Sequence, residues 1–259
     1  MKVRSAFRVA PAACLVALAL FGAARVDAAV VIAGTRVVYN QKDSEVTLKM
    51  SNVGAQPALV QVWADSGDAR SAPGSAGDVP FTITPPVARI DPGKGQTLRI
   101  IYTGEALAQD RESVFWLNVL EIPPKPTGEL AASNRLQLAF HSRIKLFYRP
   151  GGLPGRADHA PSQLVWQLAS DHGQAVLIAR NPSAYHVSII EVTLKSAAGA
   201  AQAADGEMVA PGKTQRFVLK GAASAVPDAK VRFRSLNDYG GPVDTEAPLL
   251  PGAAPALPQ

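Results

Sequence analysis

The sequence predicts an all-β protein built from two immunoglobulin-like sandwich domains, and three observations support this fold class. The 259 residues are 47% apolar and only 18% charged, which is enough apolar material for more than one packed core. The 21 glycines and 21 prolines are scattered between short runs of alternating apolar residues, as is typical of strands rather than helices. About seven such runs precede a Pro/Gly-rich segment and a shorter set follows it, which favours two sandwiches.

The first 28 residues are predicted to be a signal peptide. Three basic residues stand among the first eight, an apolar run covers 9–24, and Val26-Asp27-Ala28 has small residues at the spacing that a signal peptidase requires. We therefore expect the mature chain to begin at Ala29. The apolar run is shorter than the roughly 20 residues of a membrane-spanning helix, so an uncleaved membrane anchor is the less favoured alternative.

The predicted mature chain has no cysteine and little net charge. Cys14, the only cysteine, lies in the signal peptide, so neither disulfides nor thiol chemistry is available afterwards. Four of the 26 Lys and Arg residues and one of the 21 Asp and Glu residues fall in 1–28, which leaves 22 basic and 20 acidic residues. This balance lacks the basic excess that binds nucleic acid, and we expect no nucleic-acid partner.

Residues 29–150 are predicted to form the first domain. Its extended runs are VVIAGTRVVYN, SEVTLKMSNVG, PALVQVWAD, the three pieces of FTITPPVARIDPGKGQTLRIIYTG, ESVFWLNVLEIPP and RLQLAFHSRIKLFYRP. Turn signals such as Asn-Val-Gly and Asp-Pro-Gly separate these runs.

The last of these runs has two different faces. Side chains alternate along a strand, so one face carries a row of apolar residues. This row consists of Leu136, Leu138, Phe140, Ile144, Leu146 and Tyr148. Arg143, Lys145 and Arg149 point to the other face. A strand that is suited to a core therefore also carries a basic stripe.

The second domain is predicted to cover residues 151–241. RPGGLPGRA at 149–157 is the expected linker, because two prolines and three glycines cannot continue a sheet ladder. Further extended runs follow at QLVWQLAS, QAVLIARNPS, HVSIIEVTLK, KTQRFVLK and AKVRFRSLNDYG. Residues 242–259 are rich in Pro and Ala, and we expect a mobile tail that leaves the edge of the second sandwich incomplete.

The sequence shows no motif of a common catalytic or metal site. Gly-x-Ser-x-Gly and His-Glu-x-x-His are missing, and the four histidines are dispersed without ligand spacing. They are His141, His159, His172 and His186. GKGQT at 93–97 lacks the Gly-Lys-Ser/Thr ending of a phosphate-binding loop and follows a Pro-Gly turn. We expect neither an enzyme nor a bound metal or cofactor.

Six stretches resemble, in the same order, the periplasmic pilus chaperones of the PapD-like family. They are GTRVVY at 34–39, TPPVARIDPGKGQTLRI at 84–100, QDRESVFWLNVLEIPP at 109–124, RIKLFYRP at 143–150, NPSAYHVSI at 181–189 and LNDYGG at 236–241. Together these stretches extend over nearly all of the predicted mature chain.

The resemblance implies a fold, a location and partners. Such chaperones form a boomerang of two immunoglobulin-like domains with a cleft between them. They hold pilin (fimbrial) subunits in the periplasm and pass them to an outer-membrane usher, and they need no cofactor and no small-molecule substrate. A pilin subunit lacks the last strand of its own sandwich, and the chaperone lends a strand to fill the gap, which is donor-strand complementation.

Leu136, Leu138 and Phe140 are the donor residues that the resemblance implies. Each large apolar side chain that enters a subunit groove contributes about 1.5–3 kcal/mol before ordering costs. The alternative is that the three residues cover the core of their own domain. Because a free apolar row invites pairing, we expect the unliganded protein to self-associate weakly or to cap its own strand.

Two further sets of charged residues match the family. Arg36 and Lys145 match the cleft residues that grip the C-terminal carboxylate of the subunit, a group that every subunit carries. Glu112, Arg149 and Asp238 match an acid-base-acid network across the two domains, which would fix the interdomain angle. Without the resemblance, the alternative interpretation is that all five are ordinary solvated surface charges. Arg143 is assigned no role.

A different class of function is the alternative to a chaperone. Immunoglobulin-like sandwiches host many functions, so a secreted two-domain adhesin or carbohydrate-binding module is compatible with the fold. Such a protein would need an exposed aromatic platform. The 6% aromatic residues stand mostly inside apolar strands and supply little material for one.

Overall fold

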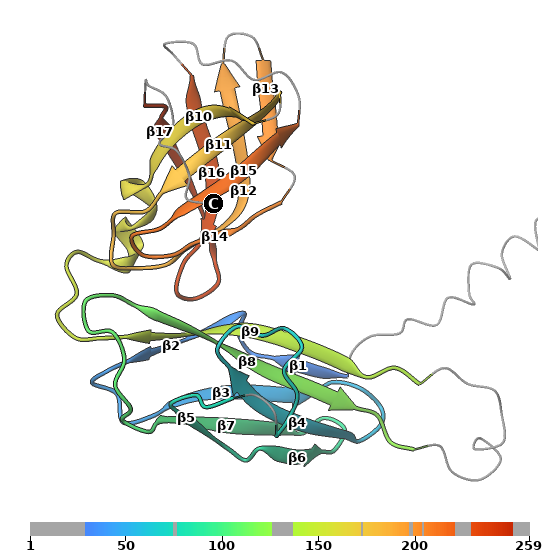
Figure 1. Ribbon diagram of the computed structural model, residues 1–259. Helices are drawn as coiled ribbons and strands as arrows, with labels where there is room; N and C mark the ends of the chain where they lie inside the picture. The colour runs from blue at the N-terminus through green and yellow to red at the C-terminus, as the bar shows by residue number, and fades with distance from the viewer. Residues whose placement is uncertain are drawn as a thin grey trace, which may run out of the picture.

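The computed structural model of the protein describes residues 29–74, 77–125, 137–171, 173–196, 199–203, 205–220 and 229–250. Two β domains lie at an angle to each other and are joined by a short connection (Figure 1). The predicted signal peptide and Leu136 lie outside the described residues. Within the described ranges, no helix has the length and apolarity needed to cross a membrane.

The N-terminal domain is a sandwich of two sheets. One sheet has the order β1 (Val30–Ile32), β3 (Val46–Asn52), β7 (Gly95–Tyr102) and β5 (Phe81–Thr84). The other has the order β2 (Arg36–Asn40), β9 (Phe140–Arg149), β8 (Ser113–Ile122), β4 (Ala58–Asp65) and β6 (Val87–Ile90). Alternate residues of both sheets meet in one core, in which Leu98, Leu117 and Leu146 are fully buried.

Strand β9 has the two faces that the sequence predicts. Leu146 and Tyr148 are buried in the domain core and Ile144 packs against it. The opposite face carries Lys145 and Arg149, and both side chains contact groups of the second domain. These two residues of the basic stripe therefore lie at the interface between the two domains.

The two edges of β9 are paired to different extents. Strand β8 pairs with β9 antiparallel from Phe140 to Tyr148. On the other edge, β2 runs parallel to β9 and pairs only from Lys145 to Arg149. Within the described residues, the stretch Phe140–Ile144 therefore has one edge without a partner strand. Backbone groups on such an edge are available to pair with another chain.

The C-terminal domain is a second β sandwich. Its strands follow the order β10 (Val165–Asp171), β11 (Gln174–Arg180), β15 (Thr214–Lys220), β13 (Gly199–Ala203), β12 (Val187–Ser196), β16 (Lys230–Leu236) and β17 (Pro242–Pro248), and β14 (Met208–Val209) pairs with β12. Trp166 lies in the core, with ring centroids 5.6 Å from Phe217 and 5.1 Å from Phe233.

The predicted fold class is confirmed. The described residues contain only two short 3₁₀ helices, η2 (Ala157–His159) and η3 (Pro161–Gln163), which follow the connection between the domains. Every other regular element is a strand, and the strands form two sandwiches.

The expectation of a mobile tail from residue 242 is wrong for its first part, because β17 completes the edge of the second sandwich. This strand pairs with β16 along its whole length, and Ala247 is buried in the domain core. Its prolines are the first and last residues of an outer strand, where a missing N–H breaks no ladder. Asp244 also pairs with Arg234 at 2.9 Å. The last nine residues of the chain lie outside the described residues.

Candidate functional site

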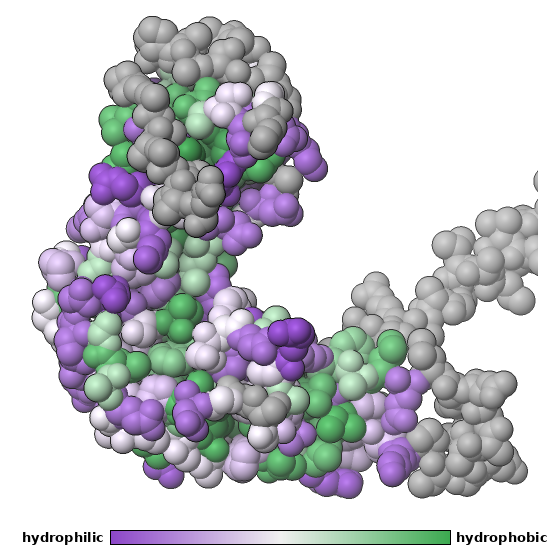
Figure 2. All heavy atoms as spheres, viewed as in Figure 1, coloured by the Kyte–Doolittle hydropathy of each residue, from purple (hydrophilic) through white to green (hydrophobic). Residues whose placement is uncertain are grey.

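The surface between the two domains is concave (Figure 2). Two cavities of about 550 Å³ each lie there, lined by residues of both domains. Arg36 lines one of them and Lys145 lines the other. The structure thus places both residues of the predicted carboxylate anchor in an interdomain cleft.

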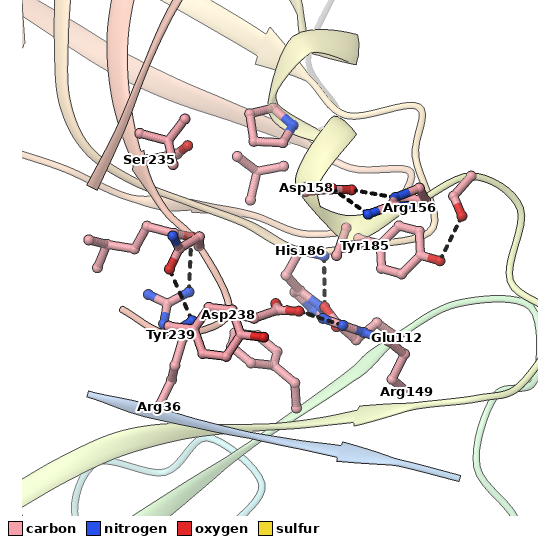
Figure 3. A pocket seen from close by; sticks show the side chains of 18 residues that line it. Arg36, Glu112, Arg149, Arg156, Asp158, Tyr185, His186, Ser235, Asp238 and Tyr239 are labelled. Atoms are coloured by element: carbon pink, nitrogen blue, oxygen red, sulfur yellow. Dashed lines mark hydrogen bonds and ion pairs between the residues drawn. The ribbon is translucent and has the colours of Figure 1, made fainter. Parts of the chain in front are cut away.

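Arg36 reaches from β2 toward the second domain (Figure 3). Its Nη1 donates a hydrogen bond of 3.2 Å to the Leu236 carbonyl oxygen, and its guanidinium carbon lies 5.8 Å from the centre of the Phe147 ring. Its Nε is buried without a hydrogen-bond partner among the described residues. Burial lowers the pKa of Arg36, while the charges of Asp238 and Glu112 act in the opposite direction.

Lys145 is the direct partner of Arg36 in the parallel register of β2 and β9. Its Nζ donates a hydrogen bond of 3.2 Å to Ser188 Oγ and lies 5.6 Å from the centre of the Trp116 ring. The pKa of Lys145 is lowered to about 8, mainly by burial and secondarily by the positive charge of Arg36. The negative charge of Glu207 acts in the opposite direction. Two partly buried cations that stand side by side attract an anion.

Arg149 connects two carboxylates from different domains (Figure 3). Its Nε and Nη2 lie 3.0 and 2.8 Å from Glu112 Oε1, and its Nη1 and Nη2 lie 2.7 and 2.9 Å from the two oxygens of Asp238. Burial alone would lower the pKa of Arg149, but its hydrogen bond to Asp238 and the charges of both carboxylates raise it. The structure thus brings together all three residues of the predicted network.

His186 belongs to the same network, although no sequence motif indicates a role for it. Glu112 Oε2 accepts a hydrogen bond of 2.9 Å from the His186 backbone N–H and lies 2.9 Å from His186 Nδ1. The Glu112 backbone N–H also donates to the Ala184 carbonyl oxygen at 2.9 Å. The partners are 74 residues apart, so histidine spacing could not reveal the contact. The only available signal was the stretch NPSAYHVSI itself.

Gly240 brings the turn after β16 close to the first domain. Its φ of +80° lies in the region that favours glycine, and its N–H donates to the Asn237 carbonyl oxygen at 3.0 Å. A Cβ at this position would overlap Thr35 Oγ1 of the first domain. With Thr35 in its present rotamer, the stretch LNDYGG therefore has room for a glycine but not for a larger residue at this position.

Arg143, which was assigned no role, is held by buried polar groups. Its Nη2 lies 2.5 Å from Asp65 Oδ1, and Asn118 Nδ2 donates to Asp65 Oδ2 at 2.6 Å. Burial alone would raise the pKa of Asp65, but the hydrogen bonds led by Arg143 and Asn118 lower it. The Arg143 guanidinium carbon also lies 4.1 Å from the centre of the Trp116 ring. This pairing neutralises Arg143 within the N-terminal domain.

The predicted donor residues lie where the free edge of β9 begins. Leu138 is 43% exposed, and Phe140, the first residue of β9, is half-buried. Leu136 lies outside the described residues. Neither Leu138 nor Phe140 belongs to the buried core of the domain.

Comparison with known proteins explains this combination of two sandwiches, a basic cleft and a free strand edge. Residues 29–154 match the N-terminal domain of the pili and flagellar-assembly chaperone PapD, and residues 159–247 match the C-terminal domain of the pili assembly chaperone PapD. The chain belongs to the PapD family of pilus assembly chaperones. Membership of this PapD-family chaperone in a family of assembly chaperones argues against the alternative of a secreted adhesin.

Individual relatives agree with this assignment. The chaperone is 44% identical over 240 residues to the probable fimbrial chaperone YadV of Escherichia coli K12. This match covers 92% of this chain and 96% of the relative. It is 43% identical over 226 residues to the chaperone protein FimB/FhaD of Bordetella pertussis, and this match covers 86% of this chain and 88% of the relative.

Solved structures of relatives share the two-domain fold. The crystal structure of the YadV chaperone is 40% identical in sequence, with a TM-score of 0.72, and the match covers 85% of this chain and 99% of that one. The Pseudomonas aeruginosa CupB2 chaperone is 36% identical, with a TM-score of 0.70, and the match covers 85% of this chain and 100% of that one.

Proposed function

We propose that this PapD-family chaperone binds pilin subunits in the periplasm by donor-strand complementation and delivers them to an outer-membrane usher. The observation that carries the proposal is the free edge of β9, which leads directly to the paired cations Arg36 and Lys145. Strand β9 and the residues that lead into it therefore combine open backbone groups and an exposed apolar side chain with Lys145, the partner of Arg36.

The apolar part of this strand supports the donation of side chains. Leu138 and Phe140 continue the row of side chains whose later members, Leu146 and Tyr148, fill the chaperone's own core. Because the row passes from a buried core to solvent, its exposed end can complete the core of a sandwich that lacks a strand. Each such side chain contributes about 1.5–3 kcal/mol on burial, before ordering costs.

The two cations support recognition of a C-terminal carboxylate. Every subunit ends in this group whatever its sequence, so it is a suitable anchor for a chaperone of several subunits. Among the described residues, Arg36 and Lys145 each donate to a single oxygen, the Leu236 carbonyl oxygen and Ser188 Oγ. Their remaining N–H groups can donate charge-assisted hydrogen bonds to the carboxylate and thereby set the register of the subunit strand.

Glu112, Arg149, Asp238 and His186 have a structural role in this proposal. They tie the two domains together at one end of the cleft. The distance between Lys145 on one wall and the second domain on the other depends on the interdomain angle. The network would therefore keep the anchor in the geometry that binds a subunit.

The proposal is tested by capture of subunits from the periplasm. The mature chain is used as bait in periplasmic extract of its own host, beside the double variant Arg36→Ala/Lys145→Ala. A control variant, Lys49→Ala/Arg89→Ala, removes two exposed cations from other strands of the same domain. We expect the unchanged and control baits to recover pilin subunits together with usher, and the anchor variant to recover at least about tenfold less.

Two results would contradict the proposal. One is equal recovery of subunits by the anchor variant and the control variant. The other is a set of captured proteins that contains no subunit with an incomplete sandwich. Unfolding midpoints of all three baits are measured in parallel, so that a loss of fold is not mistaken for a loss of binding.

A further inference from the structure

A second cavity of the cleft lies beside Lys145 and has a largely apolar lining. Trp116 and Lys145 of the N-terminal domain form one wall, and Ile190, Glu207 and Met208 of the C-terminal domain contribute to the other. The register places Trp116 next to Lys145, because these two residues are partners in the pairing of β8 and β9. An aromatic ring and two apolar side chains therefore line the same cavity as the anchor residue Lys145.

Ile190 is turned outward by a bulge in β12. Ile189 pairs with Ser235 and Glu191 pairs with Arg234, so Ile190 is an extra residue without a partner on β16. The bulge also reverses which side chains of β12 face the core, since Ile189 is buried before it and Val192 after it. Ile190 is left 46% exposed and contributes nothing to the core of the C-terminal domain.

The segment before β14 lies directly on this bulge. A Cβ on Gly206 would come within 2.5 Å of the Ile189 carbonyl oxygen and 2.6 Å of the Ile190 Cα, so only a glycine permits the approach. The Ile189 N–H donates to the Glu207 carbonyl oxygen at 2.9 Å. This packing brings Met208 and Glu207 to the same cavity as Ile190.

We infer that this cavity is a subsite for one large apolar side chain, which comes from either the last or the penultimate residue of the bound subunit. The inference rests on the proposed anchoring of the subunit carboxylate at Lys145. The last Cα is bonded to the carboxylate carbon, so the terminal side chains must lie within a few ångströms of the Lys145 ammonium group. Consecutive side chains of an extended chain point to opposite sides, so one of the last two faces the wall of Ile190 and Met208.

The lining also defines what the subsite excludes. Met208 has a flexible side chain that adapts to different apolar shapes, so the cavity can accept both aliphatic and aromatic residues. The carboxylate of Glu207 acts electrostatically on Lys145 and thus lies close to the anchor. An acidic side chain in the cavity would be repelled by Glu207 and would lose its hydration against Trp116 and Ile190.

Synthetic peptides test the subsite. Fluorescein-labelled nonapeptides of alternating Val and Thr carry Gly, Leu, Phe or Asp at the last or the penultimate position, each with a free or an amidated C-terminus. Dissociation constants are measured by fluorescence polarisation with the full mature chain. At one of the two positions, and not at the other, we expect Leu and Phe to bind at least about fivefold more tightly than Gly, and Asp to bind more weakly than Gly.

Variants of the exposed isoleucine localise the effect. Ile190→Ser should reduce the preference for Leu over Gly to about twofold or less, while amidation still weakens binding as it does for the unchanged protein. Val218→Ser is the matched control, because Val218 is 41% exposed on β15 of the same domain and does not line the cavity. It should leave the preference unchanged.

The outcomes separate this inference from the proposed function. If amidation abolishes binding but neither position discriminates between Leu, Gly and Asp, the result supports the carboxylate anchor and refutes the apolar subsite. If amidated and free peptides bind equally, or if no free peptide binds, the anchor is wrong and the subsite with it. A preference that survives Ile190→Ser also overturns the assignment of this cavity.

Discussion

Arg36 and Lys145 are direct partners in the parallel pairing of β2 and β9, so their side chains leave the sheet side by side on the face that borders the second domain. Two like charges at this separation repel each other, and the charge of Arg36 is one of the causes that lower the pKa of Lys145. Each cation is bound to one oxygen of the C-terminal domain. A carboxylate that enters between them would relieve this repulsion.

Binding of a subunit terminus is expected to weaken at alkaline pH. Burial and the charge of Arg36 lower the pKa of Lys145 to about 8, so the ammonium group of the free protein loses its proton above this pH. A carboxylate binds the protonated form, and the dissociation constant of a peptide with a free C-terminus should rise by up to about tenfold per pH unit above pH 8. Lys145→Arg should flatten this profile, because arginine remains charged. A profile that is identical in the variant would contradict the prediction.

The stability of the free protein should change in the opposite direction over the same range. The pKa of Lys145 is about 8 in the folded chain and returns to its ordinary value of 10.5 on unfolding. Between these values the unfolded chain binds more protons, so this residue makes the free energy of unfolding rise with pH. Denaturant unfolding from pH 7.5 to 10.5 should show this contribution as a difference between the unchanged protein and Lys145→Met. Parallel curves for the two proteins would refute it.

Leu138→Asp separates a donated strand from a core strand. Leu138 is 43% exposed, so an aspartate should change the unfolding midpoint of the free protein little. In the complex the same carboxylate would face an apolar groove, where an unpaired charge is costly to bury, and the yield of co-purified subunit should fall sharply. The control is Leu59→Asp, which places the same charge at an equally exposed leucine of β4. A midpoint that collapses together with the yield would identify a core strand.

Gly240→Ala should disturb the interface between the domains. The added Cβ would overlap Thr35 Oγ1. Two of the three staggered positions on the Thr35 Cβ carry heavy atoms, so the threonine must adopt the one rotamer that points hydrogen at residue 240 or the domains must move apart. We expect a lower unfolding midpoint and a wider interdomain angle in small-angle X-ray scattering. Adding Thr35→Ala should restore the angle and leave only the cost of a positive φ at alanine, about 1 kcal/mol. A double variant that resembles Gly240→Ala would show that Thr35 is not the obstacle.

Export of the chain gives a further prediction. If residues 1–28 form a cleaved signal peptide, mass spectrometry of the periplasmic fraction should detect a species that begins at Ala29. Ala28→Leu places a bulky residue at the cleavage site and should cause the uncleaved chain to accumulate. Recovery of the full-length unchanged protein from the cytoplasm would contradict the prediction.

The sequence was most informative where local alternation and turn chemistry agree with the tertiary structure. The period of two in residues 135–150 placed Leu146 and Tyr148 in the core and Lys145 on the opposite face. The prediction of a mobile tail was wrong for β17, because it rested on the prolines of residues 242–259. An outer strand tolerates prolines at its two ends. Pairing with β16 supplied the information that composition lacked.

By itself, the sequence determined which residue types stand at which spacing, and this was enough for the fold class, the family and the candidate anchor of Arg36 and Lys145. Only the tertiary structure decided that His186 joins Glu112, that Arg143 is neutralised by Asp65, and that a bulge turns Ile190 into the cleft. These contacts join residues of different strands or different domains, 74 positions apart for His186 and Glu112 and 78 for Arg143 and Asp65. The energy of such a contact depends on strand register and domain angle, which no local pattern in the chain records.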